Sequence, residues 1–460
     1  MPRLPDTFAY YFEPRMARIF LLGIISGFPW VLIGSSLNLW LQEDGLSRST
    51  IGWAGLIFGV YAFNFLWAPL VDRIRIPWIT DWIGHRRAWI VILQVVILAS
   101  LAVWSLIDPL ANLAAVIGVG LVIAIASATQ DITIDALRIE QVGQAEPEAM
   151  AAGAATAVVG WWTGYKIGGI IALETAQRFQ DAGFANYWQM TFLVLGAVVI
   201  ACNIALMFVR EAPADERVAR QAADEDRVAR TLPGPLAWLG ATVAGPLMSF
   251  FRKNGLAIAI AILGFIFLFK IGEAFLGRMS LVFYKEVGFT KSDIALYSKG
   301  LGWITTLAFS ILGGLLAIRI GLIRAMFVSG LAMAATNLLF ALLAWTGRSE
   351  PLFAAAVIMD DLTSAFATVT FVAFISMLVD RTYTATQYAL MASIGTAGRT
   401  LFAASSGELV DWLEGDWGTF FVITTVMVLP SLVCLFLIRA RLADMLAGAR
   451  VRLFTKEADP

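Results

Sequence analysis

The segment SATQDITIDALR, residues 127–138, places three ionisable side chains at the end of an apolar run that begins near Leu113. Asp131, Asp135 and Arg138 are spaced i, i+4 and i+7, so a helix holds them on one face. An ionisable group in the bilayer core costs at least about 2.5 kcal/mol unless it has a partner or faces water. We expect Asp135 to form an ion pair, either with Arg138 or with the basic loop after the second predicted span. Asp131 has no cation close in sequence, so we expect it to pair with another helix or to face a solute cavity.

Further charged residues fall within later apolar runs. FKIGEAFLGR places Lys270 and Glu273 at i and i+3, which predicts either a mutual ion pair or a Glu273 that exchanges a proton beside Lys270. MDDLTSAF contains Asp360 and Asp361, and adjacent helical residues point about 100° apart, so only one of them should face a cavity. The candidates for proton coupling are Glu273, Asp131 and Asp360.

Cations and flat rings in these runs suit an anionic solute that carries sugar rings. Lys166 in GWWTGYKIGG and Arg399 in GTAGRTLF lie in matching predicted spans of the two halves. Lys offers a compact charge and Arg a planar fork for a carboxylate, whereas Trp faces can stack on a sugar. The small residues around both cations indicate close helix packing. The substrate-binding candidates are Lys166, Lys270, Arg399, Gln130, Trp30, Trp161, Trp162 and Trp303.

The composition is that of a polytopic helical membrane protein. Of 460 residues, 59% are hydrophobic and 15% are charged, the mean hydropathy is +0.77, and the apolar residues come in runs of about twenty. We predict an all-α membrane protein with twelve transmembrane helices in two pseudo-symmetric six-helix bundles. The spans are expected to begin near Arg18, Ser49, Arg87, Asn112, Met150, Trp188, Gly255, Ser292, Gly321, Leu352, Thr386 and Asp416.

Composition and motifs exclude several classes of function. A net charge of -1 without a basic tract argues against nucleic acid, and the chain has no G-x-x-x-x-G-K-[ST] stretch for ATP-driven pumping. A single histidine, His85, in a loop, no nucleophile elbow and no cluster of metal ligands predict no enzyme, no cofactor and no metal site. Cys202 and Cys434 each fall inside a predicted span, so we expect no disulfide. The first span is expected to be retained rather than cleaved as a signal peptide.

Charge predicts the topology. Most of the 33 Lys and Arg fall in one set of loops, so both termini are expected in the cytoplasm. A linker contains the charged segment ADERVARQAADEDRVAR and then an apolar stretch that we expect to lie at the membrane interface rather than to form a thirteenth span. The predicted divisions are an N-terminal bundle, the linker and a C-terminal bundle with a cytoplasmic tail, over 1–211, 212–253 and 254–460.

The two halves also resemble each other. LWLQEDGLSRSTIG at 39–52 aligns with VFYKEVGFTKSDIA at 282–295, which matches Glu43 with Glu286. The similarity falls where the first helix of each half ends. Two parallel halves with a solute site near the membrane midplane are typical of secondary transporters.

Taken together, the motifs resemble those of the AmpG-type muropeptide permeases of the major facilitator superfamily. The likeness covers nearly the whole chain and is carried by YFEPRM, LLGIISGFPWVLIGSSLNLWL, FLWAPLVDR, GHRRAW, SATQDITIDALR, GYKIGG, FKIGEAF, DDL and TATQYALMASIGTAGR. PLVDR followed by GHRRA also resembles the superfamily's cytoplasmic gating motif. Two departures are Asn64, where a Lys is expected, and IRIPWITDWIG, which lengthens the gating loop.

This resemblance implies a secondary importer in the bacterial inner membrane that moves GlcNAc-anhydro-MurNAc peptides from periplasm to cytoplasm by proton symport. Such import serves cell-wall recycling and, in some bacteria, β-lactamase induction. The implied partners are the muropeptide, protons and the lipid bilayer, and we expect a monomer. The alternatives are a permease for another bulky anion such as acetyl-CoA and a membrane sensor that binds muropeptide without moving it. The gate residues expected from the gating motif and the fourth span are Asp72, Arg73, Arg86, Arg87, Asp135 and Arg138.

Overall fold

The computed structural model describes residues 4–46, 54–143, 146–211, 219, 221–223, 245–246, 248–289 and 302–456. Within these ranges every regular element is a helix. Eight helices in the described part of the chain are long and apolar enough to cross a membrane, and two shorter apolar helices there are Ile57–Leu66 and Ile304–Ile320. The all-α class is confirmed, whereas the number of crossings and the side on which the termini lie stay predictions.

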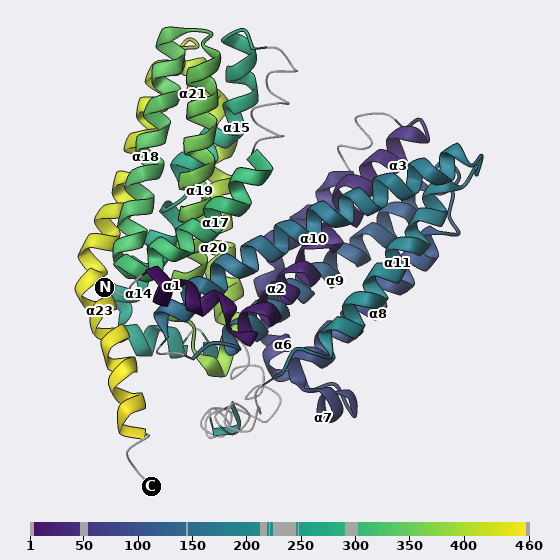
Figure 1. The fold of residues 1–460 in the computed structure, drawn as a ribbon, viewed down its shortest axis with the longest axis horizontal. Helices are drawn as coiled ribbons and strands as arrows, with labels where there is room; N and C mark the ends of the chain where they lie inside the picture. The colour runs from purple at the N-terminus through teal and green to yellow at the C-terminus, as the bar shows by residue number, and fades with distance from the viewer. Residues whose placement is uncertain are drawn as a thin grey trace.

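Helices from the first half of the chain form one bundle and those from the second half another (Figure 1). The first consists of α2 (Pro14–Gly27), α3 (Leu37–Glu43), α5 (Val60–Phe63), α6 (Ala68–Arg73), α8 (His85–Trp104), α9 (Leu113–Glu140), α10 (Pro147–Asp181) and α11 (Tyr187–Leu206). The second consists of α14 (Leu256–Leu268), α15 (Ile271–Glu286), α17 (Gly302–Ile320), α18 (Leu322–Thr346), α19 (Glu350–Leu378), α20 (Thr384–Ala404), α21 (Ser406–Trp412), α22 (Trp417–Val426) and α23 (Leu429–Lys456). Two short helices, α1 (Leu4–Ala9) and α7 (Ile79–Ile83), pack against α17 and α8 respectively.

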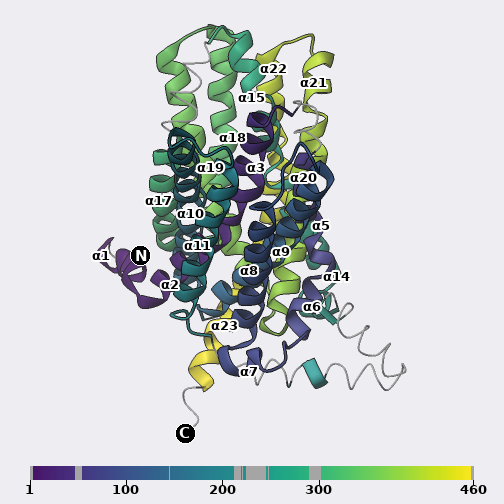
Figure 2. The same ribbon diagram turned by 90° about the vertical axis from the view of Figure 1, so that its right-hand side faces the viewer.

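The bundles meet at one end of the molecule and lean apart toward the other (Figure 1). Figure 2 places α7 and the end of α23 at the end where the bundles meet. There α20 contacts α6 and α9, and α10 contacts α17 and α19. We call this the closed end.

The apolar cores follow the same division. One core joins the bundles, with Ile139 of α9 and Ile318 of α17 in the same cluster of buried side chains. Two other large cores each belong to one bundle and contain, respectively, Trp104 and Phe353. Because burial of apolar surface is the main favourable term in packing, the shared core holds the closed end together.

Small residues allow the helices to cross closely. A Cβ atom added to Gly27 of α2 would run into the carbonyl of Trp161 on α10. Between the bundles, Gly314 of α17 lies against Ala151 and Ala155 of α10. These contacts agree with the packing role expected for small residues in membrane helices.

The ends of α3 and α15, where the two aligned segments begin, occupy equivalent places. Glu43, at the end of α3, accepts a hydrogen bond from Trp188 Nε1 at the start of α11 (2.6 Å). Glu286, at the end of α15, accepts one from Trp417 Nε1 at the start of α22 (2.7 Å). The predicted alignment of Glu43 with Glu286 is therefore confirmed by geometry.

Aromatic rings beneath these bonds are repeated as well. Trp40 and Phe192 meet edge to face with centroids 4.9 Å apart, and Phe283 and Phe421 do so at 4.7 Å. Edge-to-face contact is a favoured arrangement of aromatic pairs. Each bundle thus ties the end of its first predicted span to the start of its last predicted span in the same way.

Two of the predicted spans contain breaks that the apolar pattern did not indicate. α2 ends at Gly27, and the chain continues past Pro29, which has no backbone N–H, into the π-helix Val31–Ser36. Between α14 and α15, Lys270 has non-helical φ and ψ of -106° and 16°. Broken helices place helix ends inside the membrane, where transporters bind solutes and ions.

Part of the linker packs against the second bundle. Residues 245, 246 and 248–254 are helical. Gln387 of α20 donates hydrogen bonds to the Pro246 carbonyl (2.9 Å) and to Ser249 Oγ (2.7 Å). Most of the charged segment lies outside the described residues, so the interfacial position of the linker and the domain limits stay predictions.

Candidate functional site

Asp131 of α9 contacts a group of aromatic rings in the first bundle. Its Oδ1 accepts a hydrogen bond from Ser26 Oγ (2.7 Å) and its Oδ2 one from Trp30 Nε1 (3.5 Å). Trp30 lies just after the break in α2, and its ring centroid is 4.6 Å from that of Tyr61 and 5.6 Å from that of Trp161. Among the described residues, the hydrogen-bond partners of Asp131 are therefore neutral. We call the following rings the aromatic cluster: Trp30, Phe58, Tyr61, Trp161, Trp162 and Tyr165.

Lys166 stands at the edge of the aromatic cluster. Its Nζ lies 5.7 Å from the ring centroid of Trp162 and 5.8 Å from that of Tyr165. Trp161 stacks on Tyr165 at 5.6 Å with an angle of 15° between the ring planes. An ammonium this close to ring faces is attracted by their electron density. Flat apolar faces, one carboxylate and one cation therefore share a part of this bundle.

The break between α14 and α15 holds a buried ion pair. Lys270 Nζ lies 2.8 Å from Glu273 Oε2 and donates hydrogen bonds to Glu273 Oε1 (3.1 Å) and Thr368 Oγ1 (2.7 Å). Ser364 Oγ, also on α19, donates to Glu273 Oε1 (2.7 Å). Glu273 lies in the first turn of α15, where the helix dipole favours a negative charge. The ion pair allowed by the i, i+3 spacing is present, and α19 completes it.

The adjacent carboxylates of α19 have different surroundings. Asp361 Oδ2 accepts a hydrogen bond from Thr305 Oγ1 of α17 (2.7 Å). Asp360 lies close enough to Lys270 and Glu273 for their charges to interact, and its buried Oδ1 has no hydrogen-bond partner among the described residues. Asp360 is thus the member of the pair that faces the ion pair. We call Lys270, Glu273, Asp360 and Arg399 the charged cluster.

The other substrate candidates lie in distinct settings. Arg399 is exposed on α20, donates to Thr396 Oγ1 (3.2 Å), and its charge acts on the buried ion pair. Gln130 is fully buried and donates to the Ile25 carbonyl (3.0 Å), so it packs α9 against α2 in this conformation. Trp303 falls on α17, with its side chain outside the described residues. Among the side chains that the structure describes, no hydrogen bond or ion pair links the aromatic cluster to the charged cluster.

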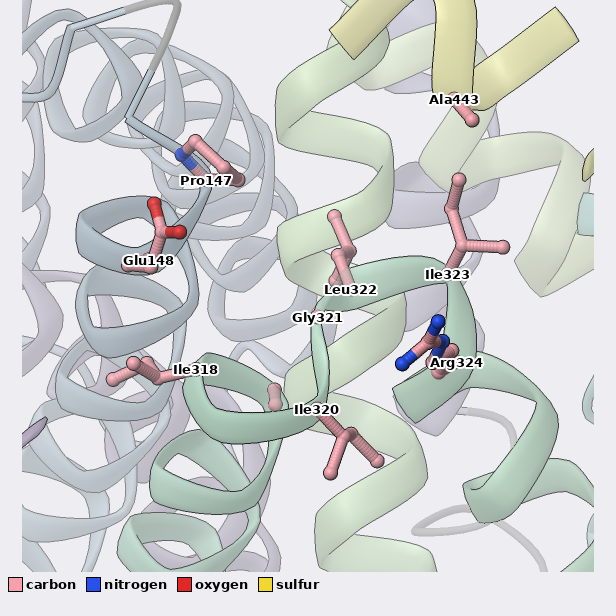
Figure 3. Close-up of a pocket in the computed structure, with 10 residues that line it drawn as sticks. Pro147, Glu148, Ile318, Ile320, Gly321, Leu322, Ile323, Arg324 and Ala443 are labelled. Carbon is pink, nitrogen blue, oxygen red and sulfur yellow. The ribbon is translucent and has the colours of Figure 1, made fainter. Parts of the chain in front are cut away.

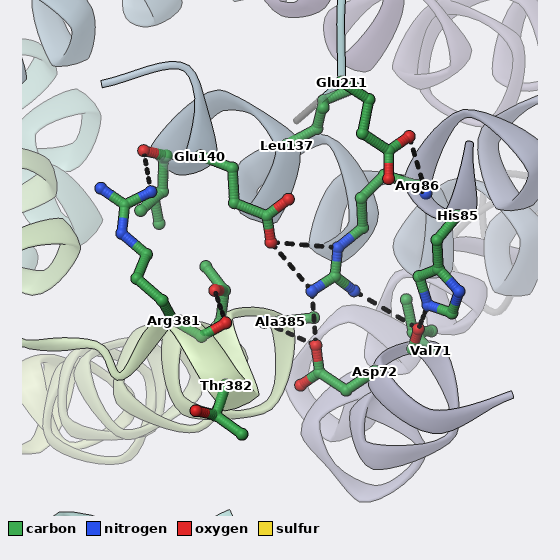
Figure 4. Close-up of polar contacts among 12 residues, drawn as sticks. Val71, Asp72, His85, Arg86, Leu137, Glu140, Glu211, Arg381, Thr382 and Ala385 are labelled. Carbon is green, nitrogen blue, oxygen red and sulfur yellow. Dashed lines mark hydrogen bonds and ion pairs between the residues drawn. The ribbon is translucent and has the colours of Figure 1, made fainter. Parts of the chain in front are cut away.

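At the closed end, Arg86 lies between two carboxylates (Figure 4). Its Nη2 bonds Asp72 Oδ1 (2.6 Å) and Glu140 Oε1 (3.1 Å), and its Nη1 donates to the Val71 carbonyl (3.3 Å). The Arg86 side chain is 0% exposed and that of Asp72 is 1% exposed. A guanidinium buried this deeply is tolerated because its donors are paired. The arrangement ties the start of α8 to the ends of α6 and α9.

Asp72 also ties the first bundle to the second. Its Oδ2 accepts hydrogen bonds from the backbone N (2.8 Å) and Oγ1 (2.6 Å) of Thr386, and its Oδ1 accepts one from the preceding backbone N–H (3.2 Å). These donors lie in the first turn of α20, where free N–H groups carry partial positive charge. In the opposite direction, Arg381 of the second half donates to the carbonyls of Ile139 and Val142 at the end of α9. We call these bonds across the bundles the gate contacts.

Asp135 pairs with Arg138, one of the two partners expected for it. Arg138 Nη2 and Nε lie 2.9 Å and 3.1 Å from Asp135 Oδ1. Arg138 Nη2 also donates to Ser376 Oγ of α19 (3.2 Å), and its guanidinium carbon lies 5.5 Å from the ring centroid of Tyr388. The pair therefore contacts the second bundle as well.

Further hydrogen bonds of the gating motif involve backbone groups on one side. Arg73 donates to the carbonyl of Gln221 (3.3 Å). The backbone N–H groups of Arg86 and Arg87 donate to the carboxylate of Glu211 (2.8 Å and 3.1 Å). Glu211 thus caps α8, as a carboxylate at a helix N-terminus should.

Sequence reasoning missed Glu140, Glu211, Arg381 and Thr386. Each lies far along the chain from its partners, so no local spacing indicates it. One signal was available, because LVDR occurs at 70–73 and again at 378–381. Both copies contribute to the gate contacts.

Comparison with known proteins agrees with this geometry. The family description of the Major Facilitator Superfamily matches residues 19–346. The proton:xylose symporter XylE has a TM-score of 0.61 and 15% identity, covering 93% of this chain and 95% of that one. The human organic anion transporter MFSD10 has a TM-score of 0.58 and 17% identity, covering 92% and 100%. The chain therefore belongs to the Major Facilitator Superfamily and is a multi-pass membrane transporter.

Curated relatives narrow this assignment. The putative transporter AmpG 4 of Rickettsia conorii is 30% identical over 430 residues, which cover 93% of this chain and 97% of that protein. The anhydromuropeptide permease of Escherichia coli strain K12 is 31% identical over 431 residues, covering 94% and 81%. Within the superfamily the chain is an AmpG-type permease of the bacterial inner membrane.

Proposed function

We propose that this protein carries anhydromuropeptides from periplasm to cytoplasm together with protons, by alternating access. The observation that carries the proposal is the charged cluster at the break in the second bundle, in a chain related to an anhydromuropeptide permease. A GlcNAc-anhydro-MurNAc peptide has two sugar rings and free peptide carboxylates. The aromatic cluster and the charged cluster match these two parts of the molecule.

The aromatic cluster is the site for the sugar rings. Rings stack on Trp faces, and a carboxylate such as that of Asp131 accepts hydrogen bonds from sugar hydroxyls. Asp131 already accepts from Ser26 and Trp30, which fixes its orientation. Lys166 at the edge of the cluster adds a positive charge for an anionic solute.

The charged cluster is the site for peptide carboxylates and for the proton. In the ion pair, the Glu273 carboxylate binds the Lys270 ammonium and keeps it from other carboxylates. When a proton neutralises Glu273, this attraction is lost and Lys270 becomes available to a substrate carboxylate. Arg399 can bind a second carboxylate, because its guanidinium is exposed and always charged. Proton and substrate are then coupled, since each favours the state that binds the other.

The gate contacts close one end of the path between the bundles, so solute can enter only from the other end. The closed end carries the loop between α6 and α8, which its arginines predict to be cytoplasmic. The structure then corresponds to a state that receives solute from the periplasm. Release into the cytoplasm requires the gate contacts of Asp72 and Arg381 to break and the periplasmic ends to approach.

Uptake into proteoliposomes tests the proposal. Radiolabelled GlcNAc-anhydro-MurNAc tripeptide should accumulate under an inward proton gradient, and Glu273→Gln should abolish this accumulation while retaining part of the exchange between internal and external substrate. Glu408→Gln, which removes an exposed glutamate from the same bundle, serves as the matched control. Normal gradient-driven uptake by Glu273→Gln refutes the coupling role. Saturable binding without accumulation identifies a sensor, and competition by excess acetyl-CoA identifies a broader anion permease.

A further inference from the structure

The closed end has surfaces that take no part in the gate contacts. A pocket on the seam is lined by both bundles, with Pro147 of the first on one side and Ile323 of the second on the other (Figure 3). The short helix α7 lies elsewhere, on the outer flank of the first bundle beyond the start of α8 (Figure 1). It packs against α8 and contains part of IRIPWITDWIG, the segment that lengthens the gating loop.

Two tryptophan rings on α7 are almost fully exposed. Trp78, which immediately precedes the helix, is 87% exposed, and Trp82, in its last turn, is 84% exposed. Thr80 and Ile83 of the same helix are buried. The helix therefore has one side on the bundle and an exposed side that is mainly aromatic.

The backbone of this segment is held in one conformation. Thr80 Oγ1 accepts a hydrogen bond from the backbone N–H of Ile76 (2.9 Å), and Trp89 Nε1 donates one to the Ile74 carbonyl (2.9 Å). Trp78 has a φ of 62°, in the left-handed region that residues other than glycine rarely adopt. Backbone strain of this kind persists mainly where the strained geometry serves a function. The outward position of the ring is thus maintained at a conformational cost.

The exposed apolar surface continues from α7 along the span that precedes it. Leu66, Leu70 and Ile74 are all exposed. On the other side of α6, Val71 is buried in a core that also contains Ala389 of α20. Because the bundles are in contact at this end, the exposed side of α6 faces away from the space between them and toward lipid. The two rings on α7 therefore extend a lipid-facing surface beyond the end of the span.

We propose that α7 is an interfacial anchor, with the rings of Trp78 and Trp82 among the lipid headgroups. Tryptophan is enriched at this depth because its ring is apolar and its N–H can donate a hydrogen bond to a headgroup or to water. A helix with one exposed aromatic side lies along the interface rather than across the bilayer. Anionic lipids repel a carboxylate, but Asp81 beside these rings is paired with Arg75 at 2.7 Å. The anchor fixes the depth at which the gating loop lies in the membrane.

Collisions of a spin label with oxygen and with a nickel chelate test the anchor, because oxygen concentrates in lipid and the chelate stays in water. Cys202 and Cys434 are replaced by Ser, and the label is attached at Trp82→Cys or, for comparison, at Ala182→Cys in the exposed turn after α10. The protein is placed as single copies in nanodiscs of phosphatidylcholine. The ratio of oxygen to chelate collisions should be several-fold higher at position 82 than at position 182. Equal ratios overturn the anchor.

Two variants of the protein labelled at position 82 separate the rings from the loop that carries them. Trp78→Ser removes the remaining ring and should lower the collision ratio toward the value at position 182. Trp412→Ser removes an exposed tryptophan at the end of α21 and should leave the ratio unchanged. An unchanged ratio in Trp78→Ser, or an equal fall in Trp412→Ser, overturns the role of the rings.

A second copy of the chain is the other occupant that the same label can detect. A water-like collision ratio in single-copy nanodiscs, together with spectral broadening by neighbouring labels in densely packed vesicles, identifies a contact between copies and overturns the lipid assignment. Because no uptake is measured, these outcomes do not depend on the muropeptide proposal.

Discussion

Replacing Asp72 by Asn should shift the protein strongly toward a state in which the closed end is open. The carboxylate accepts one bond from Arg86 and three from the first turn of α20, and only those three are lost when the bundles separate. A hydrogen bond to a charged group contributes about 1.5–3 kcal/mol, whereas a neutral one contributes about 1 kcal/mol. Since the amide keeps one oxygen as an acceptor, we expect the closed state to lose about 3 kcal/mol. This corresponds to a change of about 100-fold in the ratio of the two states.

Spin labels at Phe208→Cys, just after α11, and at Leu437→Cys on α23 measure this shift directly in detergent, with Cys202 and Cys434 replaced by Ser. Asp72→Asn should convert a mainly short distance distribution into a mainly long one. Arg86 retains Glu140 as a charged partner, so the buried guanidinium is not left alone in the variant. Asp81→Asn is the matched control, because Asp81 lies on α7, the next helix after α6, and pairs with Arg75 on the exposed surface.

An unchanged distance distribution in Asp72→Asn, with the protein still folded, contradicts this role of the carboxylate. A shift of the same size in Asp81→Asn also contradicts it, because loss of any negative charge near the closed end would then be the cause. A third variant, Thr386→Val, removes a single hydrogen bond across the bundles. It should give a smaller shift in the same direction.

Three further predictions concern the substrate site, the packing and the effect of pH. Arg399→Lys should raise the KM for uptake of a peptide-bearing muropeptide more than the KM for the free disaccharide, because Lys lacks the planar fork that binds a carboxylate. Equal changes in the two KM values would show that Arg399 does not bind the peptide carboxylate. Gly27→Ala should lower the thermal unfolding temperature by several degrees, since overpacking costs about 1–3 kcal/mol, whereas Gly169→Ala, with open space around it, should not. The hydrogen bond and charge of Arg15 lower the pKa of Glu146 in the folded protein. The ion pair therefore stabilises the fold at pH values above the pKa that Glu146 has in the unfolded chain, and this stabilisation is lost as the pH falls through the lowered pKa. The unfolding temperature of the parent should therefore drop more steeply below about pH 4.5 than that of Glu146→Gln, and parallel curves would contradict this.

The sequence predicted the features that depend on local pattern. Apolar runs of span length indicated the helices, and the alignment of Glu43 with Glu286 located an equivalent bond to Trp in each half. The i, i+3 spacing of Lys270 and Glu273 indicated an ion pair as one of two outcomes, and the pair forms between the residue that precedes α15 and the first turn of that helix.

Features that depend on approach between distant segments could not be predicted in this way. The break at Lys270 is invisible to hydropathy, since α14 before it is apolar and its immediate neighbours Phe269 and Ile271 are apolar too. The partners of Asp72 on α20 lie more than three hundred residues further along the chain. Gln130 stands beside Asp131 in sequence yet is buried between helices, because neighbouring helical residues face different directions. The substrate, proton and gate roles of the named residues stay predictions.

The duplicated bond between a glutamate and a tryptophan gives this transporter an internal reference. Glu43→Gln and Glu286→Gln make the same chemical change at equivalent positions of two bundles that carry different binding groups. A defect common to both variants reports on how a bundle holds its own shape. A defect confined to one must arise from the rings of the first half or the charges of the second, so the molecule itself separates scaffold from function.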